Sequence, residues 1–125
     1  MDNDKYPESE LTGKIIGIAI ETHKKLGPGY NEKIYQRVLA KELTENKIPH
    51  KSQPKISIII EDFNAGYQIL DFIIDNKVIL ELKSMKEINN EHVKQMISYL
   101  KATNIKIGLI LNFGKSKLEI KRIIL

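Results

Sequence analysis

The 125-residue chain fits one domain, and its 42% hydrophobic and 29% charged residues are typical of an ordinary globular protein. It contains no cysteine, which excludes disulfides and thiolate zinc sites and is compatible with a reducing cytoplasm. The net charge of +4 suits a polyanionic partner such as nucleic acid, although many basic proteins bind none.

The N-terminal end of the chain is polar and acidic. Its first ten residues lack the apolar core of a signal peptide, so we expect a cytoplasmic protein. The longest strongly apolar stretch, Ile105 to Phe113, is far shorter than the ~20 residues of a membrane-spanning helix, so no membrane partner is expected. We expect residues 1–8 to form a frayed tail and residues 9–125 to form a single domain.

Two helical patterns follow this tail. Ser9 is expected to cap the first helix, and Gly27-Pro28-Gly29 is expected to end it, because Gly27 can adopt the left-handed conformation and proline cannot continue a helix. Asn31 is expected to cap the second helix. That would place Glu32 in the first turn, where the helix dipole favours a carboxylate.

The middle of the chain predicts strands and the end alternates between helix and strand. A turn at 62–66 is expected between the first two strands, and a helix is expected over 90–103. The strands are expected at residues 55–61, 67–74, 77–83, 105–113 and, as a last addition, 118–125. The first three would form an antiparallel meander. The order helix, three strands, helix, strand predicts an α/β/α layering.

Three charged residues interrupt the apolar hairpin of 67–74 and 77–83: Asp71, Glu81 and Lys83. Glu81 and Lys83 are two residues apart, so they share one face of the strand. Two acids and a lysine are what a hydrolytic magnesium site requires, because hard cations bind carboxylate oxygens and an ammonium can orient the attacking water. The alternative is an exposed strand face that carries a salt bridge.

The hairpin register separates these two interpretations. A two-residue turn at Asp75-Asn76 would pair residues whose numbers sum to about 151, with Asp71 opposite Leu80 and on the other face from Glu81. A shared metal site needs Asp71 opposite Glu81. We therefore predict a three-residue loop over 75–77, or an equivalent bulge.

The remaining candidates each have an ordinary structural explanation. Glu32 alone would be a solvated first-turn acid, Tyr35 a core residue and His92 a surface histidine. Gln95 and Tyr99, four residues apart on the predicted helix, could hydrogen-bond a phosphate or each other, or could form only a helix shoulder.

Taken together, the motifs resemble those of the PD-(D/E)XK nuclease superfamily in its RecB-like branch. Asp71 is followed about ten residues later by Glu81-Leu82-Lys83 and then by the helix with Gln95 and Tyr99. Residues 29–35, Gly-Tyr-Asn-Glu-Lys-Ile-Tyr, fit the G-x-x-E-x-x-Y signature of the small GxxExxY proteins. The likeness extends from residue 11 to residue 124 and includes Gly-Leu-Ile-Leu-Asn-Phe-Gly at 108–114. Leu70 replaces the proline before the aspartate, a departure that the superfamily tolerates.

The resemblance implies a restriction-endonuclease-like αβββαβ core, with a mixed four-stranded sheet flanked by helices, and a Mg²⁺-dependent phosphodiesterase in which Mn²⁺ can substitute. Lys83 would position or activate the water. Gln95 and Tyr99 would line the substrate groove. The implied magnesium ligands are Asp71, Glu81, the Leu82 backbone carbonyl and Glu32.

Three functions remain open at this point. The first is a DNA endonuclease or exonuclease, and the second is a nucleic-acid-binding or assembly module with this fold and little turnover. The third is a purely structural subunit of a larger complex. The oligomeric state is also open, with a homodimer among the alternatives.

Overall fold

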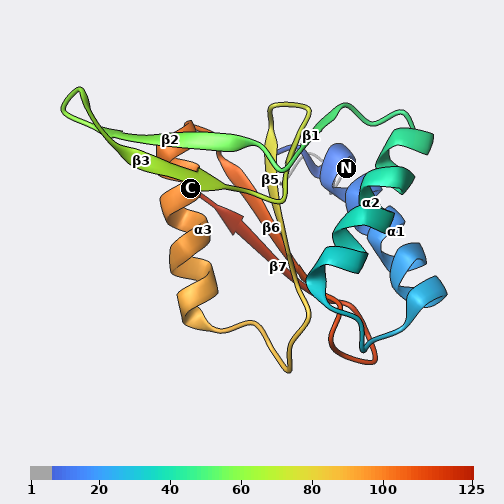
Figure 1. The fold of residues 1–125 in the computed structure, drawn as a ribbon. Coiled ribbons are helices and arrows are strands. Elements are labelled where there is room, and N and C mark those ends of the chain that lie inside the picture. The colour runs from blue at the N-terminus through green and yellow to red at the C-terminus, as the bar shows by residue number, and fades with distance from the viewer. Residues whose placement is uncertain (1–6) are drawn as a thin grey trace.

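A five-stranded mixed sheet forms the centre of the protein, with strand order β1-β4-β5-β6-β7. The computed structural model describes residues 7–125. Helices α1 and α2 cover one side of the sheet, and α3 lies on the other (Figure 1). The helices are α1 (Ser9–Leu26), α2 (Glu32–Glu45) and α3 (Asn90–Thr103). The strands are β1 (His50–Ser52), β2 (Lys55–Ile60), β3 (Phe63–Ile69), β4 (Phe72–Ile74), β5 (Val78–Lys83), β6 (Ile107–Asn112) and β7 (Glu119–Ile124).

This arrangement confirms the predicted α/β fold with helices flanking a mixed sheet. Strands β5 and β6 are parallel, and the other neighbours in the main sheet are antiparallel. The main sheet has five strands instead of the predicted four. Strands β1 and β7 form its two edges, whereas β2 and β3 form a separate two-stranded sheet. Strand β7 was predicted, whereas β1 has only three residues and no clear periodicity.

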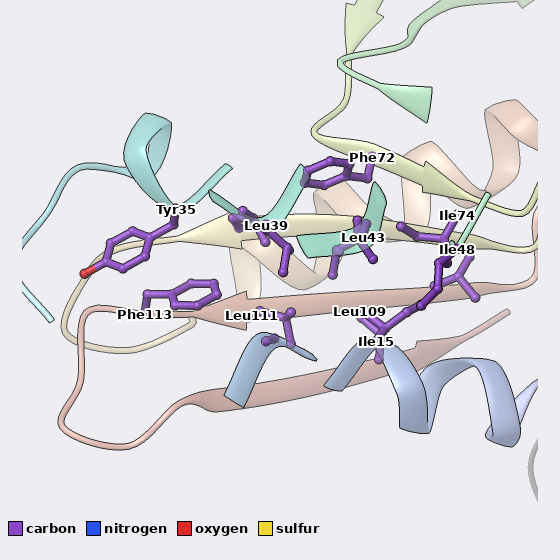
Figure 2. Packing of buried hydrophobic residues seen from close by; sticks show 14 of the residues in the cluster. Ile15, Tyr35, Leu39, Leu43, Ile48, Phe72, Ile74, Leu109, Leu111 and Phe113 are labelled. Carbon is purple, nitrogen blue, oxygen red and sulfur yellow. The ribbon is translucent and has the colours of Figure 1, made fainter. Parts of the chain in front are cut away.

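Each face of the main sheet has its own apolar core. Figure 2 shows Tyr35, Leu39 and Leu43 of α2 together with Ile15 of α1 in the larger core, near Phe113 at the end of β6. The Tyr35 and Phe113 rings stack with centroids 4.6 Å apart. On the other face, α3 packs against the sheet through Met96, Tyr99 and Leu100. Its partners on β4, β5 and β6 alternate along each strand with the residues that belong to the larger core. The central strands are therefore apolar on both faces, as predicted for 105–113.

The loop between α1 and α2 is hydrogen-bonded to a tyrosine side chain of α2. Helix α1 ends at Leu26, just before the predicted glycine, and Gly27 is its C-cap. Gly27 has a positive φ of 69°, but its ψ of 177° is extended, so it does not adopt the left-handed helical conformation that was predicted. The Tyr35 hydroxyl donates to the Gly27 carbonyl (2.5 Å) and accepts from the Tyr30 amide (3.3 Å). Asn31 caps α2 by accepting from the Ile34 amide (3.3 Å). Tyr35 is therefore a core residue that also fixes the position at which α2 begins.

The start of α1 differs from the prediction. Glu8 is the N-cap residue, and Ser9 is the first residue of the helix. The predicted tail at 1–8 falls almost wholly outside the described residues, and Pro7 and Glu8 form a turn. None of the helices within residues 7–125 is both long and apolar enough to cross a membrane.

The predicted strand over 67–74 is wrong, because the chain bends at Leu70 and Asp71. Strand β3 ends before the bend and pairs with β2 in a separate two-stranded sheet, whereas β4 begins after it. Two backbone bonds hold the bend: Leu70 N donates to Pro54 O (3.0 Å), and Gln53 N donates to Asp71 O (2.8 Å). The predicted meander therefore divides between two sheets.

The turn between β2 and β3 is also earlier than predicted. It consists of Glu61 and Asp62, which both have positive φ, as the two-residue hairpin turn requires. Gly66, which was expected to belong to the turn, lies in β3 with a φ of 135° beside a bulge. The glycine therefore relieves strain in a bulge and does not close the hairpin.

Candidate active site

The register of the β4–β5 hairpin confirms the prediction on which the site depends. Phe72 pairs with Leu80 and Ile74 pairs with Val78, so paired residue numbers sum to 152. The three-residue loop 75–77 closes the hairpin, with positive φ at Asp75 and Asn76. Continuing this register by one residue places Asp71 opposite Glu81, on the face of the sheet covered by α3.

The two carboxyl groups meet where the strands separate. The β4–β5 ladder ends at Phe72 and Leu80. Beyond it, Asp71 Oδ2 accepts a hydrogen bond from the Leu82 amide (2.7 Å), and the Asp71 carboxyl is within hydrogen-bonding reach of Glu81. Because the amide and carbonyl of one residue point to the same side of an extended strand, the Leu82 carbonyl is also directed to this open edge. Two carboxylates and a carbonyl therefore converge there.

Burial and the nearby acid change the charge state of Glu81. Desolvation raises the pKa of Glu81 to about 9, and the hydrogen bond with Asp71 and its negative charge act in the same direction. Lys83 opposes them, because its positive charge lowers the pKa of Glu81. At neutral pH and without metal, Glu81 therefore keeps its proton and can donate it to the Asp71 carboxylate. A bound cation would favour loss of the Glu81 proton.

Lys83 and Tyr99 border the pair from different elements. Lys83 follows Glu81 on the same face of β5, and its carbonyl accepts from the Phe113 amide (2.8 Å), which fixes the end of the strand. Tyr99 of α3 is only 8% exposed. Its pKa is raised by burial first and then by the charges of Glu81 and Asp71. Gln95 lies one turn earlier on α3 and is exposed.

The structure does not assemble Glu32 with these groups. Within residues 7–125, no three Asp, Glu, His or Cys side chains are arranged so that they could hold one metal ion. Glu32 is exposed in the first turn of α2, and this helix packs on the opposite face of the sheet from Glu81. The start of α2 is nevertheless close to the end of β5, because Ser84 Oγ donates to the Tyr30 carbonyl (2.6 Å). The role of Glu32 stays a prediction.

The sequence interpretation missed Asn112, which organises the chain after Lys83. This side chain is fully buried at the end of β6. Its Nδ2 donates to Met85 O (3.0 Å) and Glu119 Oε1 (2.9 Å), and its Oδ1 accepts from the amides of Met85 and Gly114 (3.0 Å each). A Cβ on Gly114 would overlap the Met85 backbone, so only glycine fits. The signal was present, because a polar residue within an apolar strand needs partners.

His92 has a structural role. Asn89 Oδ1 accepts from the Glu91 and His92 amides, and His92 Nδ1 accepts from the Asn89 amide (3.2 Å). These reciprocal bonds form a capping box at the start of α3. His92 was predicted to be a surface histidine, and it is half-buried because its ring completes this cap.

Comparisons with known proteins agree with the fold. A family model described as the PD-(D/E)XK nuclease superfamily matches residues 9–123. No curated protein matches the chain. Among solved structures, the fold is similar to that of an alkaline exonuclease (LHK-Exo) from Laribacter hongkongensis, with a TM-score of 0.54 and 14% sequence identity. The match covers 75% of this chain and 56% of the exonuclease chain, so this chain spans little more than half of that protein's length.

Proposed function

The chain belongs to the PD-(D/E)XK nuclease superfamily, and we propose that it hydrolyses phosphodiester bonds in DNA as a Mg²⁺-dependent nuclease. Within the superfamily we assign it to the RecB-like branch and the GxxExxY proteins, on the motifs at 29–35 and 81–83. The observation that carries the proposal is the Asp71–Glu81 pair, which meets beside the open edge of β5. The cysteine-free composition suits a cytoplasmic location.

The donor groups at this edge suit a hard divalent cation. Asp71 and Glu81 offer carboxylate oxygens and Leu82 offers a carbonyl, the ligand types that Mg²⁺ and Mn²⁺ prefer. The raised pKa of Glu81 supports the same assignment, since a bound cation would replace the Glu81 proton and offset the cost of burying its charge. We propose Glu32 as an additional ligand, directly or through water. Bound metal would supply a Lewis acid and lower the pKa of the attacking water.

The residues around the pair would prepare the substrate. Lys83 would orient the attacking water and offset negative charge on the phosphate. Tyr99 would keep its proton, because burial and the neighbouring acids raise its pKa, and it could therefore donate a hydrogen bond to a phosphate oxygen. Gln95 would add a second donor from the exposed side of α3. The net charge of +4 favours approach of a polyanion.

Cleavage of labelled DNA in Mg²⁺ or Mn²⁺ tests this function, with EDTA as the metal-free arm. We expect Lys83→Ala to reduce the rate by about 10²-fold or more, the scale of a lost charge-stabilising group. Lys24→Ala is the matched control, because it removes an exposed lysine of α1, a helix that packs on the opposite face of the sheet from the pair. Failure to cleave duplex, single-stranded and branched DNA as well as RNA would contradict the proposal.

A binding or assembly module with the same fold is the second candidate. The separation of Glu32 from the pair favours it, because a metal held by fewer ligands supports less turnover. This candidate predicts salt-sensitive binding with little sequence preference. Binding that persists in EDTA, with no product in Mg²⁺ or Mn²⁺, would favour it over the nuclease.

A further inference from the structure

The β2–β3 hairpin exposes apolar side chains on both of its faces, and the nuclease site does not use them. It extends from the body of the protein beside α3 (Figure 1). Its exposed large apolar side chains are Ile59, Ile60, Phe63, Tyr67 and Ile69, each 55–66% exposed. The hairpin forms a sheet of only two strands, so each strand has an unpaired edge. Isolated two-stranded sheets are marginal in water, and exposed edges tend to pair with another chain.

The two edges differ, and only that of β2 is regular. Leu70 N donates to Pro54 O, so even-numbered residues of β2 bond to β3 and odd-numbered residues direct their amide and carbonyl outward. The outward groups belong to Lys55, Ser57 and Ile59. On β3 a bulge leaves Ala65 without an opposite residue, because Ile58 pairs with Gly66 and Ile59 with Asn64. Bulges disrupt further pairing, so β2 offers the better edge.

The charges at the two ends of β2 have opposite signs. Lys55 is the first residue of β2, and Glu61 is the turn residue that directly follows its last residue, Ile60, six positions away or about 20 Å along an extended chain. They are too far apart to pair within one chain. An antiparallel β2 strand centred on Ile58 would place Lys55 opposite Glu61 twice, by symmetry, and Ile56 opposite Ile60. A parallel neighbour in register would place like charges together.

We propose that β2 pairs in antiparallel fashion with β2 of a second copy of this chain, forming a four-stranded sheet across a two-fold axis at Ile58. The contact is isologous, and the β3 bulges at both outer edges stop further addition at two chains. Glu61 and Asp62 at the tip would repel phosphates, which disfavours nucleic acid as the occupant of this edge. The proposal does not depend on DNA cleavage.

Sedimentation of the full chain over a wide concentration series tests the dimer. Wild type should shift from 14.4 kDa toward twice that mass as concentration rises. Lys55→Glu and Glu61→Lys should each weaken dimerisation by about tenfold or more, because each change creates two like-charge contacts. An equimolar mixture of the two variants should recover wild-type dimerisation, because every contact then joins opposite charges. Lys24→Glu on α1 is the control for the charge change itself.

A backbone variant tests the edge without charge. Ser57→Pro removes an outward amide and leaves the bonds to β3 intact, so it should abolish the dimer while circular dichroism shows a folded chain. If Ser57→Pro does not fold, the charge-swap mixture decides alone. A wild-type chain that stays monomeric, or a mixture that does not recover dimerisation, would overturn the proposal. Loss of nucleic-acid binding in the charge variants, without a change in mass, would also overturn it and assign the hairpin to the substrate.

Discussion

Two consecutive hairpins of this chain are both rich in isoleucine, yet they have opposite environments. The β4–β5 hairpin is inserted in the main sheet, and its paired strand residues, 72–74 and 78–80, are all buried. The β2–β3 hairpin lies outside that sheet, and every residue of β3 is exposed. The comparison shows that β-branched composition predicts a strand but not its burial.

The position of the charges differs in the same way. Acids in the buried hairpin lie side by side where its strands separate, and burial changes the pKa of Glu81. Acids in the exposed hairpin lie at its tip, in water. Two carboxylates in the buried β4–β5 hairpin destabilise the fold unless a cation binds them. Charges at the exposed tip of the β2–β3 hairpin affect only which molecules bind there. This contrast is the physical basis for a metal site in one hairpin and a docking edge in the other.

Truncation of matched apolar residues should produce the largest difference between the hairpins. We expect Leu80→Ala in β5 to lower the free energy of unfolding by about 2–5 kcal/mol, because its fully buried side chain leaves a cavity. Ile60→Ala in β2, where the side chain is 66% exposed, should change it by about 0.5 kcal/mol or less in the monomer. Urea unfolding at low protein concentration measures both. Equal losses would mean that the β2–β3 hairpin is covered in solution.

The end of the buried hairpin should depend on a residue from another strand. Asn112→Ala removes partners from the amide and carbonyl of Met85, so we expect a loss of roughly 2–3 kcal/mol. The loss should appear in unfolding measurements made in EDTA. Asn64→Ala in β3 is the matched exposed asparagine and should cost far less, even though its side chain accepts from Gly66 N. Comparable losses would show that Asn112 does not organise this end of the site.

Stability without metal should depend on pH through Glu81. The ordinary pKa of this carboxyl is 4.5, and burial beside Asp71 raises it to about 9 in the folded chain. Between these values the unfolded chain loses the proton while the folded chain retains it, so this group lowers stability as pH rises, and the effect levels off above the folded pKa. At ~1.4 kcal/mol per pKa unit, the full shift sets an upper limit of about 6 kcal/mol on this change.

Unfolding in EDTA across this pH range measures the effect. Glu81→Gln should remove this part of the pH dependence, whereas Asp62→Asn at the exposed hairpin tip should leave it unchanged. A wild type and a Glu81→Gln variant with the same pH dependence would contradict the buried, proton-sharing pair.

The requirement of a shared site predicted the β4–β5 register, and local capping and helix-breaking residues predicted where α1 ends and where α2 begins. A shared site required Asp71 opposite Glu81, which needs a three-residue loop or an equivalent bulge, and the structure has the loop. The bend at Leu70 was not predictable in the same way, because it depends on bonds to Gln53 and Pro54, many residues away. The partners of Asn112 at Met85 are also distant in sequence. Local patterns thus specified elements, and non-local hydrogen bonds decided where the sheets divide.

Thermal melting with and without Mn²⁺ tests the metal site most directly, using wild type, Asp71→Asn and Glu81→Gln. In EDTA we expect both variants to melt at the same temperature as wild type or higher, because each relieves the buried acid pair and the amide oxygen introduced by Asp71→Asn can still accept from the Leu82 amide. Wild type should gain about 2.7 kcal/mol when Mn²⁺ is 100-fold above its Kd, and the variants should gain little. Destabilised variants in EDTA, together with a wild type that does not respond to Mn²⁺ or Mg²⁺, would contradict the account and identify the pair as a structural salt-bridge partner of Lys83.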